Sequence, residues 1–476
     1  MHPEFLHKLF KNLSALFLFY LVDMPQSNEK PTCEICGKEF ATKSTLKNHL
    51  KNKVPCKAPA NLIQTVLEEA GVPTPSEPSG PFRPVSKKFH TTLSKEVRLE
   101  EGIFFTPKKV RDLLFAKLAE LNVKPKTILE PSFGSGEFLL DAQRHYPTAK
   151  LIGVEKNKKL FDSLKMPSAK LENMDFTEWE GSADVIIGNP PYFVMKAGVS
   201  AKEKKAFHEK YEECMTGRPN MYVIFIYQCL KEHLLDNGFL AFVIPTSLFN
   251  CSYYQPLRNY IEDNSTICHL EILDKPGFFE TGQPTALLIL QKKQPPSPPP
   301  YIFHSALVVS YITPHWAELK KITENTTTLY KLGLGVKTGS VVWNQVKDHL
   351  TDDSSETLLI YASNINKSEL KLNNLLGTQK KQYVKKMTKP TLAGPVILVE
   401  RGYGNGFSFN AVLCSLTKFY AENHINVIYA QTKESEKNLE RVLASFKDER
   451  SMQFIKMFMG NGSMSSTELE TLMPVF

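Results

Sequence analysis

Short apolar runs alternate with amphipathic stretches between residues 96 and 293, and this alternation restricts the fold more than any other feature of the chain. Five of the runs have the length and apolar content of buried strands, namely TILE, LIGVE, DVIIGN, FLAFVIP and ALLILQ. Buried strands separated by amphipathic helices form a sheet that helices cover on both faces. The pattern therefore predicts a doubly wound, Rossmann-like α/β domain over residues 96–293.

Proline-rich segments mark the borders of this domain. Five prolines between residues 73 and 84 rule out long regular structure, so residues 58–95 are expected to form a linker. The sequence QPPSPPP at residues 294–300 predicts a second, extended linker. Residues 301–476 show strands and helices without a clear period, and we expect a C-terminal α+β domain there.

The charge and the cysteines restrict the class of protein. A net charge of +8 over 476 residues fits a polyanion-binding surface on one face better than a chain that is basic throughout. Of the eight cysteines only Cys33, Cys36 and Cys56 are close together, which is not the spacing of a disulfide framework in a chain of this length. We therefore expect a reducing, intracellular compartment.

Residues 1–24 form an apolar leader that resembles a signal peptide. Its apolar run, residues 13–22, spans only ten residues, and no small-x-small cleavage site follows it. We therefore expect neither secretion nor a membrane span. Two alternatives remain open: that Met24 is the true start of translation, or that the leader is an amphipathic docking helix.

A group of metal-ligand residues occupies residues 31–57, with the spacing Cys33-x2-Cys36-x12-His49-x6-Cys56. Tetrahedral Zn²⁺ takes four such ligands, and the spacing is typical of a small ββα zinc finger. The segment departs from the C2H2 pattern in its longer last gap and in the cysteine at the fourth position. It predicts a structural Zn²⁺ site.

A turn with two glycines, Gly134 and Gly136, follows the first predicted strand in the sequence EPSFGSG. Such glycines let the backbone approach a ligand and open the next helix. Glu155 ends the next strand, where a carboxylate can accept hydrogen bonds from the ribose hydroxyls of a nucleotide-like cofactor. Asp175 and Phe176 come after the third strand and offer an acceptor for an adenine amino group and a ring to stack on the adenine. A solvated strand end at Glu155 and a core aromatic at Phe176 are the structural alternatives, and the order of the motifs favours a cofactor site.

The run from Asp184 to Gly188, the fourth strand when the one before Asp175 is counted, leads directly into Asn189-Pro190-Pro191-Tyr192, where two consecutive prolines make a stiff turn. The Asn189 carboxamide oxygen and the Pro190 carbonyl can accept hydrogen bonds from an exocyclic NH2 group. This draws the nitrogen toward tetrahedral geometry, so that its lone pair faces a methyl sulfonium. Tyr192 is placed to stack on an extruded base. Positioning then carries the reaction and no strong base is needed, although a simple turn is the structural alternative.

These segments together resemble the amino-adenine DNA methyltransferases of restriction-modification systems. The resemblance is to the gamma-like subgroup, in which the cofactor half precedes the catalytic motif and the recognition domain is C-terminal. It covers residues 96–293. Eight segments occur in order: FFTPKKVRDLL, ILEPSFGSGEFL, LIGVEKN, MDF, IIGNPPY, PNMYVIF, FVIPTSLF and GFFETGQPTALLIL.

The resemblance implies an adenine-specific, site-specific DNA methyltransferase that moves a methyl group from S-adenosylmethionine to N6 of a flipped adenine in duplex DNA. The expected cofactor-binding residues are Thr106, Glu130, Pro131, Gly134, Gly136, Glu155, Asp175, Phe176, Asn189 and Phe225. The expected catalytic residues are Asn189, Pro190, Pro191, Tyr192 and Phe279, with Phe278 as the alternative to Phe279. A separate cognate restriction endonuclease is a candidate partner, and we expect a monomer.

Two segments of the C-terminal domain resemble recognition regions of the same broad group, which includes enzymes of large algal viruses. In residues 334–346 and 401–407, Trp343 and Tyr403 are candidates for base contacts, and Lys337 and Arg401 are candidates for phosphate contacts. Loop and core roles for the same residues remain open.

Two rival functions remain open as well. An Asn-Pro-Pro-Tyr turn clamps any planar NH2 group, so an RNA adenine or protein glutamine N-methyltransferase is the alternative within enzymes. The long C-terminal domain, the Cys/His segment and Phe279 favour DNA. A non-catalytic DNA-binding module that keeps the fold is the alternative from another class, and the intact Asn189 and Tyr192 argue against it. A fused restriction nuclease is not supported, because no convincing Pro-Asp…Glu-x-Lys metal site occurs.

Overall fold

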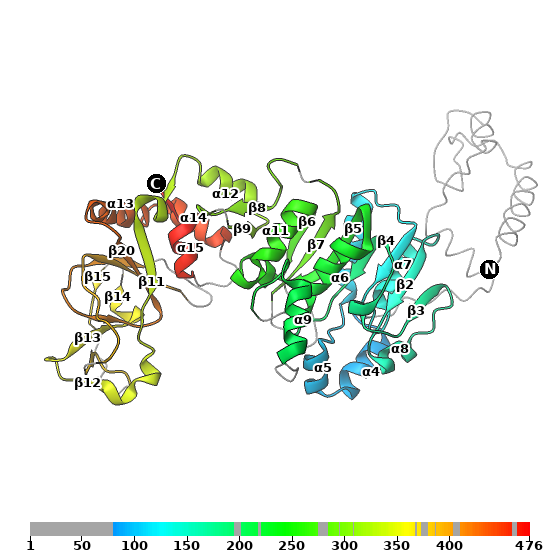
Figure 1. Cartoon of the computed structure of the whole chain (residues 1–476), viewed down its shortest axis with the longest axis horizontal. Coiled ribbons are helices and arrows are strands. Elements are labelled where there is room, and N and C mark those ends of the chain that lie inside the picture. Colours follow the sequence, from blue (N-terminus) through cyan, green and yellow to red (C-terminus); the bar gives the residue numbers. More distant parts are fainter. Residues whose placement is uncertain are drawn as a thin grey trace, which may run out of the picture. The chain divides into compact units, whose positions relative to one another are not determined.

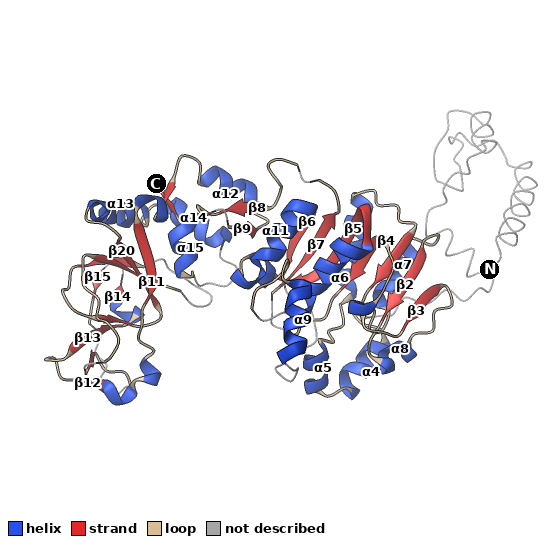
Figure 2. Ribbon diagram, viewed as in Figure 1, coloured by secondary structure: helices blue, strands red, loops and turns tan. Residues whose placement is uncertain are grey.

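A seven-stranded sheet forms the centre of the N-terminal α/β domain, with the strand order β3-β2-β1-β4-β5-β7-β6 (Figures 1 and 2). The strands are β1 Thr127–Glu130, β2 Lys150–Val154, β3 Ala169–Glu172, β4 Ala183–Gly188, β5 Leu234–Pro245, β6 Thr266–Leu273 and β7 Thr285–Gln291. Neighbours from β3 to β5 pair in parallel, whereas β7 is antiparallel to both β5 and β6. The five apolar runs that predict buried strands all lie in this sheet, which confirms the α/β fold.

The computed structural model describes the compact unit Gly80–Phe476. Within it, residues 195–200, 218–219, 275–283, 295, 308, 367–368, 373–378, 386, 403–409 and 459–463, and the side chains of residues 201–204, are not described. The expected leader and zinc finger, with its ligands Cys33, Cys36, His49 and Cys56, lie outside the described residues. So do Phe278, Phe279 and Tyr403.

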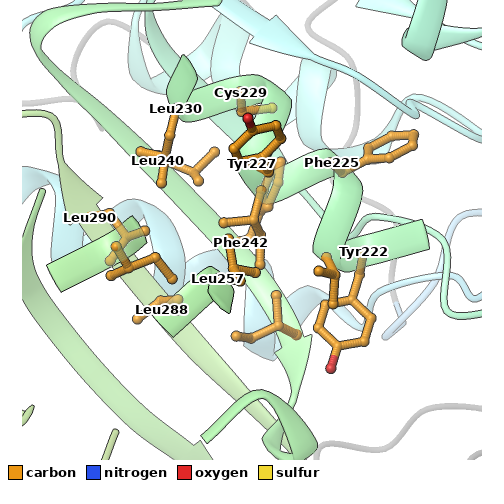
Figure 3. Close-up of a cluster of buried hydrophobic side chains, with 14 of the residues drawn as sticks. Tyr222, Phe225, Tyr227, Cys229, Leu230, Leu240, Phe242, Leu257, Leu288 and Leu290 are labelled. Carbon is orange, nitrogen blue, oxygen red and sulfur yellow. The ribbon is translucent and has the colours of Figure 1, made fainter. Parts of the chain in front are cut away.

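Two buried clusters cover the two faces of the sheet, because side chains alternate along each strand. On one face Leu129 of β1 and Phe242 of β5 pack with α10 and α11, and Figure 3 shows Phe242 in one cluster with Tyr222 and Phe225 of α10. On the other face Ile128 packs with α6 and α7. The helices are α4 Pro84–Thr92, α5 Lys95–Glu101, α6 Lys108–Glu120, α7 Glu137–His145, α8 Lys158–Ser163, α9 Ala201–Tyr211, α10 Met221–Gln228 and α11 Gln255–Asn264.

The expectation of a linker up to residue 95 is wrong for its last part, because Pro84–Thr92 form α4. A proline in the first turn of a helix is tolerated, since that N–H has no helical acceptor. The preceding residue ties the helix to the α/β domain. Arg83 donates from its backbone N–H to Glu137 Oε1 and from its guanidinium to the Ser135 carbonyl, each over 3.0 Å.

The C-terminal part of the chain is an α+β arrangement. One four-stranded sheet has the order β11-β20-β17-β18, and a second has the order β12-β16-β13-β19. The strands are β8 Ile302–His304, β9 Ser310–Ile312, β11 Leu334–Thr338, β12 Leu350–Thr351, β13 Thr357–Ile360, β16 Tyr383–Val384, β17 Val396–Glu400, β18 Ala411–Cys414, β19 Tyr420–Ala421 and β20 Ile425–Ala430. The helices are α12 Trp316–Ile322, α13 Asn438–Ser445, α14 Glu449–Phe458 and α15 Ser466–Thr471. Two short antiparallel strand pairs also belong to this part of the chain: β10 Thr327–Thr328 with β21 Pro474–Val475, and β14 Ile365–Asn366 with β15 Glu369–Leu370.

A buried arginine joins the two parts of the described chain. Arg258 of α11 is fully buried and donates to the Ser310 carbonyl of β9 over 2.6 Å. It also donates to the carbonyls of Leu248 and Cys251, over 2.9 and 2.7 Å. Among the described helices, none is long and apolar enough to span a membrane.

Candidate active site

The parallel strands bring the sequence motifs to one edge of the sheet. Strand β1 pairs in parallel with β2 and β4, so that Glu130, Glu155 and Asn189 all stand at or just beyond carboxyl ends of neighbouring strands. In open α/β sheets this edge is where ligands bind. The motifs are therefore neighbours in space as well as ordered in sequence.

The glycine turn has a backbone that side chains would disturb. Gly134 and Gly136 have φ angles of +55° and +78°, in the left-handed region that glycine adopts without strain. A Cβ atom on Gly136 would also collide with the side chain of Leu164. The turn therefore needs glycine at both positions, and Gly136 serves as the N-cap of α7.

Glu155 connects the end of β2 to the glycine turn. Its Oε2 accepts the backbone N–H of Gly134 over 2.8 Å, and its Oε1 accepts that of Asn157 over 2.7 Å. Burial raises the pKa of Glu155 above its ordinary value, although both of these bonds favour the ionised form. A carboxylate has about four lone-pair positions, so each oxygen can still accept a ligand hydroxyl.

Glu130 is buried at the end of β1, just before the glycine turn. The side chain is 2% exposed, and its Oε2 accepts the backbone N–H of Leu139, in the first turn of α7, over 3.1 Å. Burial raises the pKa of Glu130 well above that of an ordinary carboxyl group. Its visible role is to hold the turn and α7 together, and the expected contact with a cofactor stays a prediction.

Asp175 keeps its charge at the end of β3. Burial alone raises the pKa of Asp175, but the Lys156 ammonium, 2.8 Å away, and hydrogen bonds from Thr177 outweigh it, so the pKa lies below its ordinary value. Phe176 is 2% exposed and packs against Phe225, with ring centroids 4.8 Å apart. Phe176 thus fills the core beside Asp175, and its stacking on a cofactor stays a prediction.

Thr106 belongs to the segment between α5 and α6 that faces the glycine turn. It is buried, and its carbonyl accepts a hydrogen bond from Arg111 over 2.5 Å. The same guanidinium forms ion pairs with Glu137 and, over 2.6 Å, with Asp141 of α7. The FFTP segment is therefore attached to the helix that begins at the glycine turn.

The Asn189 carboxamide is held at both ends. Its Nδ2 donates to the carbonyl oxygen of Phe104 over 2.9 Å, and its Oδ1 accepts from the Tyr192 hydroxyl. The same hydroxyl lies 2.6 Å from the Val243 carbonyl oxygen. A hydroxyl has one proton, so it can serve Val243 when another donor reaches Asn189 Oδ1. Pro190 is buried.

Aromatic rings surround Tyr192. The ring of Phe104 stacks on it with centroids 6.0 Å apart and planes at 26°, and the ring of Tyr222 meets it edge-on, 5.9 Å away at 82°. Burial of the hydroxyl raises the pKa of Tyr192 well above its ordinary value. The phenol therefore stays protonated and able to donate.

Three residues of this arrangement were not singled out from the sequence: Gly102, Phe104 and Tyr222. Gly102 has a φ of +65°, and a Cβ atom there would lie 2.7 Å from Tyr192 N and 2.8 Å from Pro191 Cβ. The backbone before FFTP therefore passes directly over the Asn-Pro-Pro-Tyr turn. Gly102, shortly before FFTP, was the one sequence signal for a close backbone contact at this place. The contact itself could not be predicted, because it joins residues far apart in the chain.

The candidate DNA contacts of the C-terminal part are only partly described. Trp343 lies beneath two ammonium groups, with Lys347 Nζ 5.6 Å and Lys380 Nζ 5.3 Å from the ring centroid. Lys337 instead lies over the ring of Tyr429, and Arg401 donates to the Asn423 carbonyl over 3.1 Å. In the described part of the chain no group of three or more His, Cys, Asp or Glu residues is arranged to hold a metal ion.

Comparisons with known proteins find relatives among the methyltransferases of restriction-modification systems. The family model of the Eco57I restriction-modification methylase matches residues 121–279. The type II methyltransferase M.CvrRI of Paramecium bursaria Chlorella virus XZ-6E is 30% identical over 403 residues, covering 83% of this chain and 99% of the relative. The modification methylase CviBIII of Paramecium bursaria Chlorella virus NC1A is 31% identical over 409 residues, with the same two coverages. A solved structure, the M protein of the type I restriction enzyme EcoKI, is 18% identical with a TM-score of 0.30, over 39% of this chain and 43% of its own.

Proposed function

We propose that this chain, which belongs to the type II methyltransferases of restriction-modification systems, methylates N6 of a flipped adenine in duplex DNA. The observation that carries the proposal is the Asn189 carboxamide, whose Nδ2 is bound to the Phe104 carbonyl. Its Oδ1 is thereby left facing Tyr192, the side on which a stacked base would lie. The preference for adenine over other amines rests on the resemblance of this motif to amino-adenine enzymes.

The glycine turn and its neighbours fit S-adenosylmethionine. Gly134 and Gly136 leave bare backbone beside the Glu155 carboxylate, which suits the ribose hydroxyls, and Asp175 offers an ionised acceptor for the adenine amino group. Thr106 and Phe225 are proposed to line the same cofactor site. When bound, S-adenosylmethionine supplies an electrophilic methyl group on sulfur.

The residues of the Asn-Pro-Pro-Tyr turn position the amine. Asn189 Oδ1 and the Pro190 carbonyl accept its two N–H groups, which releases the nitrogen lone pair from conjugation with the ring. Tyr192 stacks on the base, and its hydroxyl then donates to Val243. Phe279 closes the opposite side of the base in this proposal. Since no residue needs to remove a proton before transfer, the rate depends on orientation.

The C-terminal part is proposed to bind the DNA. Lysine ammonium groups beside an aromatic ring suit a nucleic acid, because the ammonium neutralises phosphate and the ring can contact a sugar or base. Lys347, Lys380 and Trp343 form such a group. A separate cognate endonuclease that cuts unmethylated DNA is proposed as a functional partner.

Residues 31–57 are proposed to bind one Zn²⁺ through Cys33, Cys36, His49 and Cys56. Metal analysis of the purified full chain tests this site. We expect about one zinc per chain in the wild type and a clear loss in Cys33→Ser. Equal zinc content in the two proteins would reject it.

Transfer of a radioactive methyl group to plasmid DNA, followed by chromatography of the nucleosides, tests the reaction. N6-methyladenine as the labelled product supports the proposal. N4-methylcytosine would keep the enzyme class but reject the target base. In parallel reactions with RNA or protein as the methyl acceptor, label in adenine of RNA or in protein glutamine, with none in DNA, would favour the rival substrates.

A further inference from the structure

We propose that Phe104 is a positioning residue of the transfer site, whose carbonyl orients Asn189 and whose ring fixes the plane of Tyr192. The proposal deepens, and rests on, the function proposed above. It starts from an unusual feature of Phe104: the ring is half-buried, yet it belongs to none of the buried apolar clusters of the described residues. Its neighbour Phe105 is 7% exposed and packs with Phe82.

The carbonyl of Phe104 determines which way the Asn189 carboxamide points. The two ends of a carboxamide are alike in size but opposite in hydrogen bonding, because the nitrogen only donates and the oxygen only accepts. A carbonyl oxygen can only accept, so the 2.9 Å contact with Phe104 selects Nδ2. A half-turn of the amide would set two acceptor oxygens against each other and would present N–H groups to an incoming amine. The Phe104 carbonyl therefore keeps the acceptor on the substrate side.

The ring of Phe104 acts on the second catalytic side chain. It stacks on Tyr192 with centroids 6.0 Å apart and planes at 26°. Tyr222 meets Tyr192 edge-on, at 82°, so the two contacts together restrict rotation of the tyrosine ring. A ring whose plane is already fixed favours base stacking, because ordering it during binding would cost free energy.

The backbone around Phe104 is fixed by Gly102. Gly102 is the left-handed C-cap of α5, and its Cα lies against the Asn-Pro-Pro-Tyr turn so closely that a Cβ would be 2.7 Å from Tyr192 N. Ile103 N donates to the Arg98 carbonyl over 2.9 Å. The position of the Phe104 carbonyl is therefore set by the end of α5, and one residue links that helix to both Asn189 and Tyr192.

The activity test compares Phe104→Leu with the matched control Phe105→Leu. Loss of an aromatic pair predicts a kcat about 3- to 10-fold lower in Phe104→Leu, with an unchanged KM for S-adenosylmethionine. Phe104→Tyr keeps the ring and should restore kcat. In a Tyr192→Ala background Phe104→Leu should have little further effect, whereas Phe105→Leu should act equally in both backgrounds. An equal loss from Phe104→Leu in the two backgrounds, or no loss in either, would overturn the proposal.

A substrate-independent test uses NMR of the full chain with labelled tyrosine rings. The Tyr192 signal is identified by its absence in Tyr192→Phe. We expect Phe104→Leu to shift this signal, because the ring current of the stacked phenylalanine is removed, and Phe105→Leu to leave it in place. An unmoved signal in Phe104→Leu overturns the positioning role. A moved signal in a chain that does not methylate DNA adenine would reject the proposed function and leave this inference standing.

Discussion

Glu155 accepts the backbone N–H of Gly134 over 2.8 Å, although the two residues are 21 positions apart in the chain. The end of β2 and the glycine turn after β1 are thereby held as one unit. The Glu155 carboxylate thus lies beside a turn in which Gly134 carries no side chain. In nucleotide-binding folds such a carboxylate binds the ribose hydroxyls, and the glycines let the backbone approach the rest of the ligand.

Glu155→Gln is predicted to weaken the binding of S-adenosylmethionine. The amide has one acceptor oxygen where the carboxylate has two, and hydrogen bonds to charged groups contribute about 1.5–3 kcal/mol, so we expect a loss of affinity of at least about tenfold. Calorimetric titration of the full chain measures it. Glu318→Gln, at an exposed position of α12, is the control. Equal dissociation constants for Glu155→Gln and the wild type would contradict the assigned role.

The raised pKa of Glu155 adds a pH dependence to the same prediction. Cofactor binding requires the ionised carboxylate, so affinity should fall with decreasing pH before the ordinary pKa of 4.5 is reached. Folding has the opposite sign: a raised folded-state pKa gives stability that is present below the unfolded pKa and is lost as the pH rises through the folded pKa. Both pH dependences should be weaker in Glu155→Gln. The pKa of Asp175 is lowered, so this residue ionises at lower pH, and Glu130, whose pKa is also raised, is present in both proteins and cancels in the comparison.

Tyr192 is predicted to contribute through its ring more than through its hydroxyl. Tyr192→Phe removes a neutral hydrogen bond, contributing about 0.5–1.5 kcal/mol, so kcat should fall about tenfold at most. Tyr192→Ala also removes the stacking surface, which contributes about 1–3 kcal/mol per base. Binding of duplex DNA to the methylation site should therefore weaken further, while S-adenosylmethionine affinity is unchanged. Equal effects of the two substitutions on DNA binding and kcat would reject a stacking role.

Part of the fold and of the site could be predicted from the sequence, and the remainder depends on contacts between distant residues. The apolar runs predict five of the seven strands correctly, because both faces of the sheet are buried there. The linker prediction is wrong from residue 84, because Pro84 fits the first turn of α4, and the contacts of Arg83 with Ser135 and Glu137 hold that helix in place. Those contacts join residues more than fifty positions apart.

In the catalytic motif too, the chemistry of the side chains could be predicted from the sequence, but their distant hydrogen-bond partners could not. The residue types at Asn189 and Tyr192 predict their chemistry, because an acceptor and a ring are needed there. Their partners, the carbonyls of Phe104 and Val243, are backbone atoms 85 and 51 positions away, and any residue type supplies a carbonyl. Nothing in the local pattern could identify them. At Phe176 a cofactor-stacking role and a core-packing role both require an aromatic residue. The residue type alone therefore cannot distinguish the two roles.

Arg258→Met is predicted to destabilise the fold. The substitution keeps much of the apolar stem but leaves the carbonyls of Leu248, Cys251 and Ser310 without this donor. We expect the free energy of unfolding to fall by about 2–4 kcal/mol, measured by urea denaturation. Arg441→Met, on the exposed side of α13, is the control. A change no larger than that of the control would show that Arg258 is not needed to join β9 to the α/β domain.

Lys347 and Lys380 are predicted to bind DNA phosphates. For each phosphate that the protein no longer neutralises, the slope of log K against log salt concentration should fall in magnitude by about 0.9. The double alanine variant should therefore bind duplex DNA more weakly at low salt and show a shallower slope. Lys433→Ala, which removes an exposed lysine paired with Glu436 over 2.8 Å, is the matched control. An unchanged slope in the double variant would place the DNA elsewhere.

Single-molecule sequencing of plasmid DNA from cells that express the chain tests directly whether Asn189 is needed to methylate adenine. The comparison is between the wild type and Asn189→Ala, because the alanine cannot accept a hydrogen bond from the target amine while the glycine turn and Glu155 are unchanged. We predict N6-methyladenine at one short motif with the wild type and unmodified DNA with the variant. The same modified adenines from both proteins, or unmodified adenine from a wild type that binds S-adenosylmethionine, would contradict the account.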